Sequence, residues 1–141
     1  MHIPDPIAAL RHLAIQARPG GLIAFGESDI TQAGSIPVLP LWRAVKHGIS
    51  DTFTGMGLDP AFGRGLHTLF RRAGLNPPRL TLGGPLGGAD DTDALALVVE
   101  ARRSVYPMAE QLGKVTDELA DLDTLLPRLR EVTTPSSCYR P

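Results

Sequence analysis

HIPDPIAALRHLAIQARPGGLIAFGESD, residues 2–29, is the stretch that decides the expected fold. Asp5 can accept a hydrogen bond from a free backbone N–H, and Pro6 suits the first helical position, so the pattern predicts a helix over residues 6–17. An Arg-Pro-Gly-Gly sequence then ends the helix and turns the chain. The apolar run that follows, residues 22–26, is typical of a strand buried on both faces of a parallel sheet.

Apolar residues at helical spacing predict most of the other elements. Further helices are expected over residues 40–56, 63–73, 92–105 and 117–131, with Pro107 breaking or kinking the helix that precedes it. Residues 79–82 alternate in polarity and form a candidate short strand. We therefore expect one helix-rich α/β domain over residues 1–132, followed by an irregular tail over residues 133–141.

Composition excludes several classes of protein. The net charge of −1 offers nothing to attract nucleic acid or an anionic membrane. No apolar run is long enough to span a membrane, and the first residues lack the pattern of a secretory signal, so the cytoplasm is the expected compartment. The single cysteine, Cys138, cannot form an internal disulfide.

The ordered motifs resemble class I S-adenosylmethionine-dependent methyltransferases. In that family, a short motif just past the fourth strand enters a helix, and a basic-Pro-Gly-Gly turn then feeds the fifth strand. Asp5-Pro6 and the Arg-Pro-Gly-Gly of residues 18–21 match this order and spacing, and a Phe-Gly-Arg-Gly-Leu sequence at residues 62–66 leads the later helix. The resemblance covers residues 2–132 and is strongest over 2–29 and 62–82.

The resemblance implies an incomplete Rossmann-like methyltransferase fold that uses S-adenosylmethionine as cofactor and a small molecule as methyl acceptor. A nucleotide-type cofactor needs a tight glycine turn after the first strand and an acidic residue about twenty positions later. Neither precedes residue 2, and the glycine-rich residues 83–88 lack the required spacing. We therefore expect the substrate-side half of an enzyme, from a truncated reading frame or a split subunit, with doubtful activity alone and no cofactor binding by itself.

The same resemblance selects four candidate site residues. His2 is expected beside the cofactor and the substrate, where it could orient the substrate or act as a base, and Glu27 could take a proton from a nucleophilic group. Asp29 and Trp42 are candidates for binding the substrate. Each also has a structural alternative: a terminal residue for His2, a turn or helix cap for the two carboxylates, and helix packing for Trp42.

Other polar residues are expected to be structural. Arg64 is interpreted as a surface residue near a helix start, and the Arg102-Arg103 pair as part of a solvated helix face. The histidines of the predicted helices show no i, i+4 spacing, so no metal site is predicted.

Association is expected because a half-enzyme leaves the apolar run at residues 22–25 without a neighbouring strand. The chain should therefore form a homo-oligomer or bind a complementing chain. Two alternatives stay open: a non-catalytic accessory subunit that docks onto a methyltransferase, and a helical module that binds a small apolar ligand between amphipathic helices.

Overall fold

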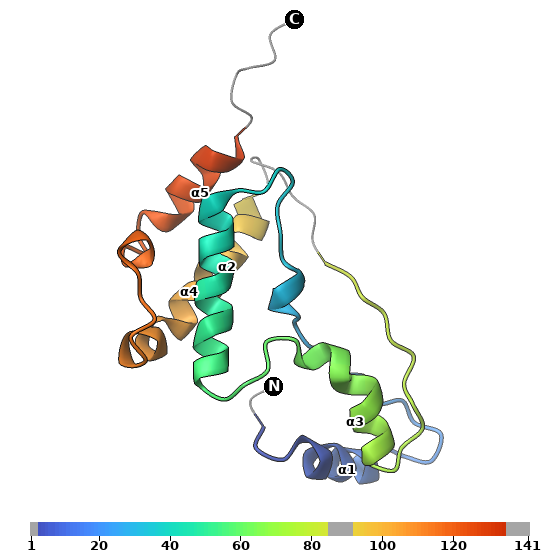
Figure 1. Ribbon diagram of the computed structural model, residues 1–141. Helices are drawn as coiled ribbons and strands as arrows, with labels where there is room; N and C mark the ends of the chain where they lie inside the picture. The colour runs from blue at the N-terminus through green and yellow to red at the C-terminus, as the bar shows by residue number, and fades with distance from the viewer. Residues whose placement is uncertain (1–2, 85–91, 135–141) are drawn as a thin grey trace, which may run out of the picture.

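The computed structural model describes residues 3–84 and 92–134, which form helices joined by extended segments (Figure 1). The α-helices are α1 (Pro6–Gln16), α2 (Pro40–Gly55), α3 (Leu66–Arg72), α4 (Thr92–Gln111) and α5 (Leu125–Thr133). Short 3₁₀ segments are η1 (Ile30–Gln32), η2 (Phe62–Gly65) and η3 (Asp117–Leu119). Within this part of the chain no helix is long and apolar enough to cross a membrane.

The larger packing unit, here called the three-helix unit, consists of α2, α4 and α5 (Figure 1). Each helix contributes one apolar face, and η3 packs into the same core. Val45 of α2 and both Leu125 and Leu129 of α5 are completely buried. The core members are Leu41, Val45, Ile49, Leu95, Val99, Val105, Leu119, Leu125 and Leu129.

The smaller unit packs α1 against α3 (Figure 1). Leu10 of α1 meets Phe70 and Ala73 at the C-terminal end of α3 in a second apolar cluster. Arg11 donates hydrogen bonds to the carbonyl oxygens of Ala73, at 3.2 Å, and Arg72, at 3.0 Å. These carbonyls lie at the end of α3, where backbone acceptors lack helical partners, so Arg11 both caps α3 and fixes it to α1.

Most predicted helices are confirmed, with three changes. The predicted helix 63–73 begins as the 3₁₀ segment η2, so α3 starts only at Leu66. The proline at position 107 neither ends α4 nor confines it to residues 92–105, because the helix continues to Gln111. The predicted helix 117–131 is instead divided into η3 and α5. The side chain of Asp121 accepts hydrogen bonds from the backbone N–H groups of Asp123 and Thr124, which stabilises a turn between the two elements.

The predicted α/β fold is wrong: no strand or sheet forms within residues 3–84 and 92–134. The turn before residues 22–26 forms as expected, with Gly20 at a φ of 76° and the Gly21 N–H donating to the carbonyl of Arg18 at 2.7 Å. The segment that follows is extended but is not the buried strand that was predicted, and Leu22 is 92% exposed. An incomplete Rossmann-like sheet is therefore not the structure of this chain.

The physical reason is that a strand needs both hydrogen-bonding neighbours and cover on its faces. An isolated extended segment leaves its N–H and C=O groups without partners, and a parallel strand is stable only between paired strands and helix layers. Here α3 lies against the 22–26 segment, where Phe25 meets Phe70 edge-on at 5.6 Å between ring centroids, and no strand of the described chain pairs with it. The candidate strand 79–82 is likewise unpaired, and Leu82 is 82% exposed.

Candidate functional site

Two extended segments and α3 enclose the first candidate site, here called the extended-segment groove. Its walls are residues 21–25 on one side and residues 75–80 on the other, and its floor includes Leu66 and Phe70 of α3. The enclosed volume is about 520 Å³. Figure 1 shows both segments running beside α3, although they are far apart in the sequence. The groove is thus bounded on two sides by backbone that pairs with no strand in this part of the chain.

Apolar side chains around this groove are open to solvent. Phe25 is 40% exposed and Leu80 49%, and Leu22 is almost fully exposed. Contiguous exposed apolar surface that is lined by unpaired extended backbone is typical of a site that takes up another polypeptide segment. This chemistry differs from that of a catalytic cleft, which needs convergent polar groups.

A polar cluster, here called the Asp29 latch, joins η1 to η2. The carboxylate of Asp29 accepts hydrogen bonds from the backbone N–H of Thr31 at 3.0 Å, from the Thr31 hydroxyl, and from Arg64 Nε at 2.6 Å. Arg64 Nη2 in turn donates to the Thr31 hydroxyl oxygen at 2.7 Å. The Asp29 side chain is only 7% exposed, and both of its oxygens accept hydrogen bonds from within the protein.

The latch holds the carboxylate of Asp29 in its charged form. The hydrogen bond from the Thr31 hydroxyl is the largest cause that lowers the pKa of Asp29 below its ordinary value of 3.8, and the guanidinium of Arg64 adds to it, while burial opposes both. Because the folded-state pKa is lower than the unfolded one, the latch stabilises the fold fully above about pH 4. That contribution is lost as the pH falls through the lowered pKa.

We expect Asp29→Asn to reduce the acid sensitivity of the fold. At pH 6 the variant should lose about 1 kcal/mol of unfolding free energy, because the amide pairs more weakly with Arg64. Near pH 2 the difference should shrink toward zero, since the wild-type carboxylate is then protonated. Urea unfolding at several pH values measures this, with the exposed Asp51→Asn as control. A difference that is independent of pH would show that the charge of Asp29 is not involved.

The other predicted site residues do not converge on one cleft. Glu27 is exposed and lies against η2, where a Cβ added at Gly63 would be 3.4 Å from the Glu27 Cβ. Trp42 is half-buried on α2 and packs against the three-helix core, as the structural alternative had it, and its indole Nε1 is buried without an acceptor. His2 lies outside the described residues. Glu27 therefore lies beside the Asp29 latch, whereas Trp42 lies apart from it and packs against the three-helix core.

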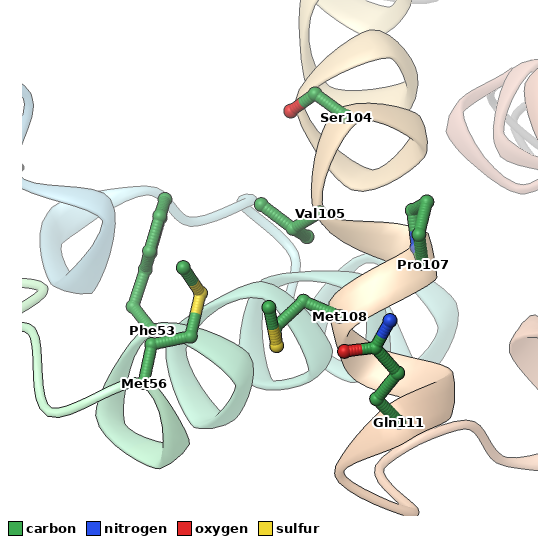
Figure 2. A pocket seen from close by; sticks show the side chains of 7 residues that line it. All are labelled: Phe53, Met56, Ser104, Val105, Pro107, Met108 and Gln111. Carbon is green, nitrogen blue, oxygen red and sulfur yellow. The ribbon is translucent and has the colours of Figure 1, made fainter.

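A second groove, here called the methionine groove, lies between α2 and α4. Figure 2 shows Phe53 of α2 and Met56, which follows the last residue of that helix, facing Val105 and Met108 of α4. The groove encloses about 380 Å³, and Ser104, Pro107 and Gln111 complete its lining. Adaptable methionine side chains suit an apolar occupant. The alternative of a small apolar ligand bound between amphipathic helices stays a prediction.

Arg102 departs most from its predicted role. The Arg102-Arg103 pair was interpreted as a solvated helix face, but Arg102 is completely buried, whereas the side chain of Arg103 is 45% exposed. None of the three guanidinium nitrogens of Arg102 has a hydrogen-bond partner among residues 3–84 and 92–134. A signal was available in the sequence: position 102 follows Leu95 and Val99 at helical spacing, so it shares their inward face.

The described part of the chain does not fit S-adenosylmethionine. Gly20 and Gly74 have positive φ values, but a Cβ at either position would meet no atom within 4 Å, so both serve turns at helix ends rather than a ligand cradle. The buried carboxylate of Asp29 is already paired. Among residues 3–84 and 92–134, no three His, Cys, Asp or Glu side chains are placed to hold a metal ion.

No protein-family model, no curated protein and no solved structure matches this chain. The methyltransferase resemblance and the cofactor that it implies therefore stay predictions.

Proposed function

We propose that this chain is an association module that binds a second polypeptide through the extended-segment groove. The observation that carries the proposal is a pair of segments on either side of that groove, the apolar residues 21–25 and the mixed residues 75–80, which pair with no strand among the described residues. A further extended segment placed there could exchange backbone hydrogen bonds with residues 21–25, whereas on the other side Pro77 and Pro78 have no N–H to donate. It would also cover apolar side chains that the chain alone leaves in water.

Free energy favours such an occupant. Full burial of one large apolar side chain contributes about 1.5–3 kcal/mol, whereas a whole domain is stable by only about 5–15 kcal/mol. Leu22, Phe25 and Leu80 all retain substantial exposed surface at the groove. Covering them is therefore a large favourable contribution compared with the stability of the isolated chain.

The 22–25 segment is both a wall of the groove and an extended apolar segment that could enter such a groove. A second copy of this chain therefore satisfies the same chemistry, and a two-fold arrangement would use the same surface on both copies. The proposed partner for self-association is accordingly a second copy of this chain, and a complementing polypeptide that presents a similar segment would use the same groove.

The methyltransferase resemblance indicates which kind of protein the proposed assembly would be. The two stretches that resemble the family most strongly, residues 2–29 and 62–82, are the ones that pack together through α1, α3 and the Asp29 latch. We propose that this unit is the docking part of a methyltransferase-family protein. In that proposal the complementing polypeptide holds the S-adenosylmethionine, and the residues described here carry no step of the chemistry.

Amide hydrogen exchange at two protein concentrations tests the docking surface. We expect the amides of residues 22–25 and 79–82 to exchange rapidly at high dilution and to become protected at concentrations where the chain associates, because pairing supplies their missing acceptors. The exposed turn at residues 113–116 should exchange equally fast at both concentrations. Protection that does not change in the two extended segments, in a chain that does associate, would place the interface elsewhere.

A further inference from the structure

The core of the three-helix unit contains a charged group without a partner. Arg102 of α4 is completely buried, and its Nε, Nη1 and Nη2 atoms make no hydrogen bond within the described residues. Its guanidinium carbon lies 5.2 Å from the centroid of the Tyr106 ring, and burial lowers the pKa of the guanidinium. An aromatic face attracts a cation but accepts none of its directed hydrogen bonds, so the five N–H donors stay unsatisfied.

The neighbouring residue Arg103, on the same helix, has carboxylate partners for its guanidinium group. Arg103 Nη2 lies 3.3 Å from a carboxylate oxygen of Asp123, and Arg103 Nε lies 3.5 Å from one of Glu100. Removing a charge from water without such a partner is strongly unfavourable. The structure thus gives carboxylates to the exposed arginine and none to the buried one.

Gly48 of α2 and Leu119 of η3 lie close to Arg102. At Gly48 of α2 the missing side chain leaves room for both the guanidinium and Leu119 of η3: a Cβ there would lie 3.7 Å from Arg102 Nε and 3.0 Å from Leu119 Cδ1. Exposed hydrogen bonds hold the η3 region in place, from the Tyr106 hydroxyl to the carbonyl of Ala120 at 3.2 Å and from Arg128 to that of Glu118 at 2.8 Å. Short segments held by exposed hydrogen bonds open at low free-energy cost.

We propose that Arg102 is the binding residue of an oxyanion site that opens when the Asp117–Leu119 segment moves away from α2. The planar guanidinium presents paired N–H donors that match two oxygens of a phosphate or carboxylate group. Binding there supplies the missing acceptors and the missing counter-charge together. The ligand is a small molecule that carries such a group, and its binding stabilises the three-helix unit.

Thermal unfolding of the full chain tests this proposal, followed by the fluorescence of Trp42, the single tryptophan, which lies in this unit. Sodium phosphate and sodium acetate are each compared with sodium chloride at equal ionic strength. The wild-type midpoint should rise saturably in at least one oxyanion, by about 5 °C at a concentration far above the Kd. Arg102→Met should unfold at or above the wild-type midpoint in chloride and should not respond, whereas Arg103→Met should respond like the wild type.

The two oxyanions distinguish a phosphate group from a carboxylate as the preferred chemistry. An equal response of wild type and Arg102→Met would overturn the proposal, because the ion then binds elsewhere. So would the absence of any response, including the case in which the carboxylate of Asp117 or Glu118 turns inward to pair with the guanidinium. If Arg102→Met does not fold, the Nε–H NMR signal of Arg102 in the wild type, assigned with Arg102→Lys, decides: it should shift with phosphate or acetate and not with chloride.

Discussion

Replacing Leu129 with alanine should lower the free energy of unfolding by about 2–5 kcal/mol, because the deletion leaves a cavity in a fully buried site. Leu129 lies on α5 with no exposed surface, inside the core that α2 and α4 complete. Against a total stability of about 5–15 kcal/mol, this loss would remove a large part of the folding free energy.

Urea unfolding followed by Trp42 fluorescence measures this loss, since Trp42 packs against the same core. Val132→Ala on the same helix is the matched control, because Val132 is 40% exposed and its truncation should change the stability by about 0.5 kcal/mol or less. If Leu129→Ala changed the stability as little as Val132→Ala, α5 would not be packed against α2 and α4.

Helices were largely predictable from the sequence because their signals are local. Asp5 caps α1 by accepting a hydrogen bond from the Ala8 N–H at 2.9 Å, and Pro6 occupies the first helical position, as the sequence suggested. The continuation of α4 through Pro107 was missed because a proline's local effect was given more weight than packing. Val105 and Ala109 on either side of it are both buried, so tertiary contacts hold the helix together there.

The strand predicted at residues 22–26 did not form because a strand depends on partners from elsewhere in the fold, not on local sequence alone. Its apolar residues specify burial, but what buries them has to come from elsewhere, and the described part of this chain supplies no neighbouring strand. The same segment consequently became the main evidence for association. The apolar pattern predicted burial, but in the described structure Leu22 is 92% and Phe25 40% exposed, so burial of this segment by another chain is a proposal.

The candidate site was predictable only in part. The carboxylate of Asp29 was identified, but its partner Arg64 lies 35 residues further along the chain and was interpreted as a surface side chain. Asp29 and Arg64 are related by no helical or strand periodicity. Only the folding of the chain brings η1 and η2 together, so the sequence alone did not predict the pair. Arg102 was missed for a different reason: its charge was given more weight than its position on the inward face of α4.

Leu22→Asp should weaken self-association by at least about 100-fold, which corresponds to about 3 kcal/mol of lost interaction free energy. The leucine is 92% exposed in the isolated chain, so the change leaves the fold of one copy intact. At a docked interface the same position would bury a carboxylate without a partner, which is costly. Leu97→Asp is the matched control, because Leu97 is 62% exposed on α4 and does not line the extended-segment groove.

Sedimentation velocity at micromolar concentration, run on the wild type, Leu22→Asp and Leu97→Asp, tests the association module most directly. We expect a dimer or larger species for the wild type and for Leu97→Asp, and a folded monomer for Leu22→Asp. A wild-type chain that sediments as a compact monomer and unfolds cooperatively, with the same behaviour in Leu22→Asp, would contradict this expectation.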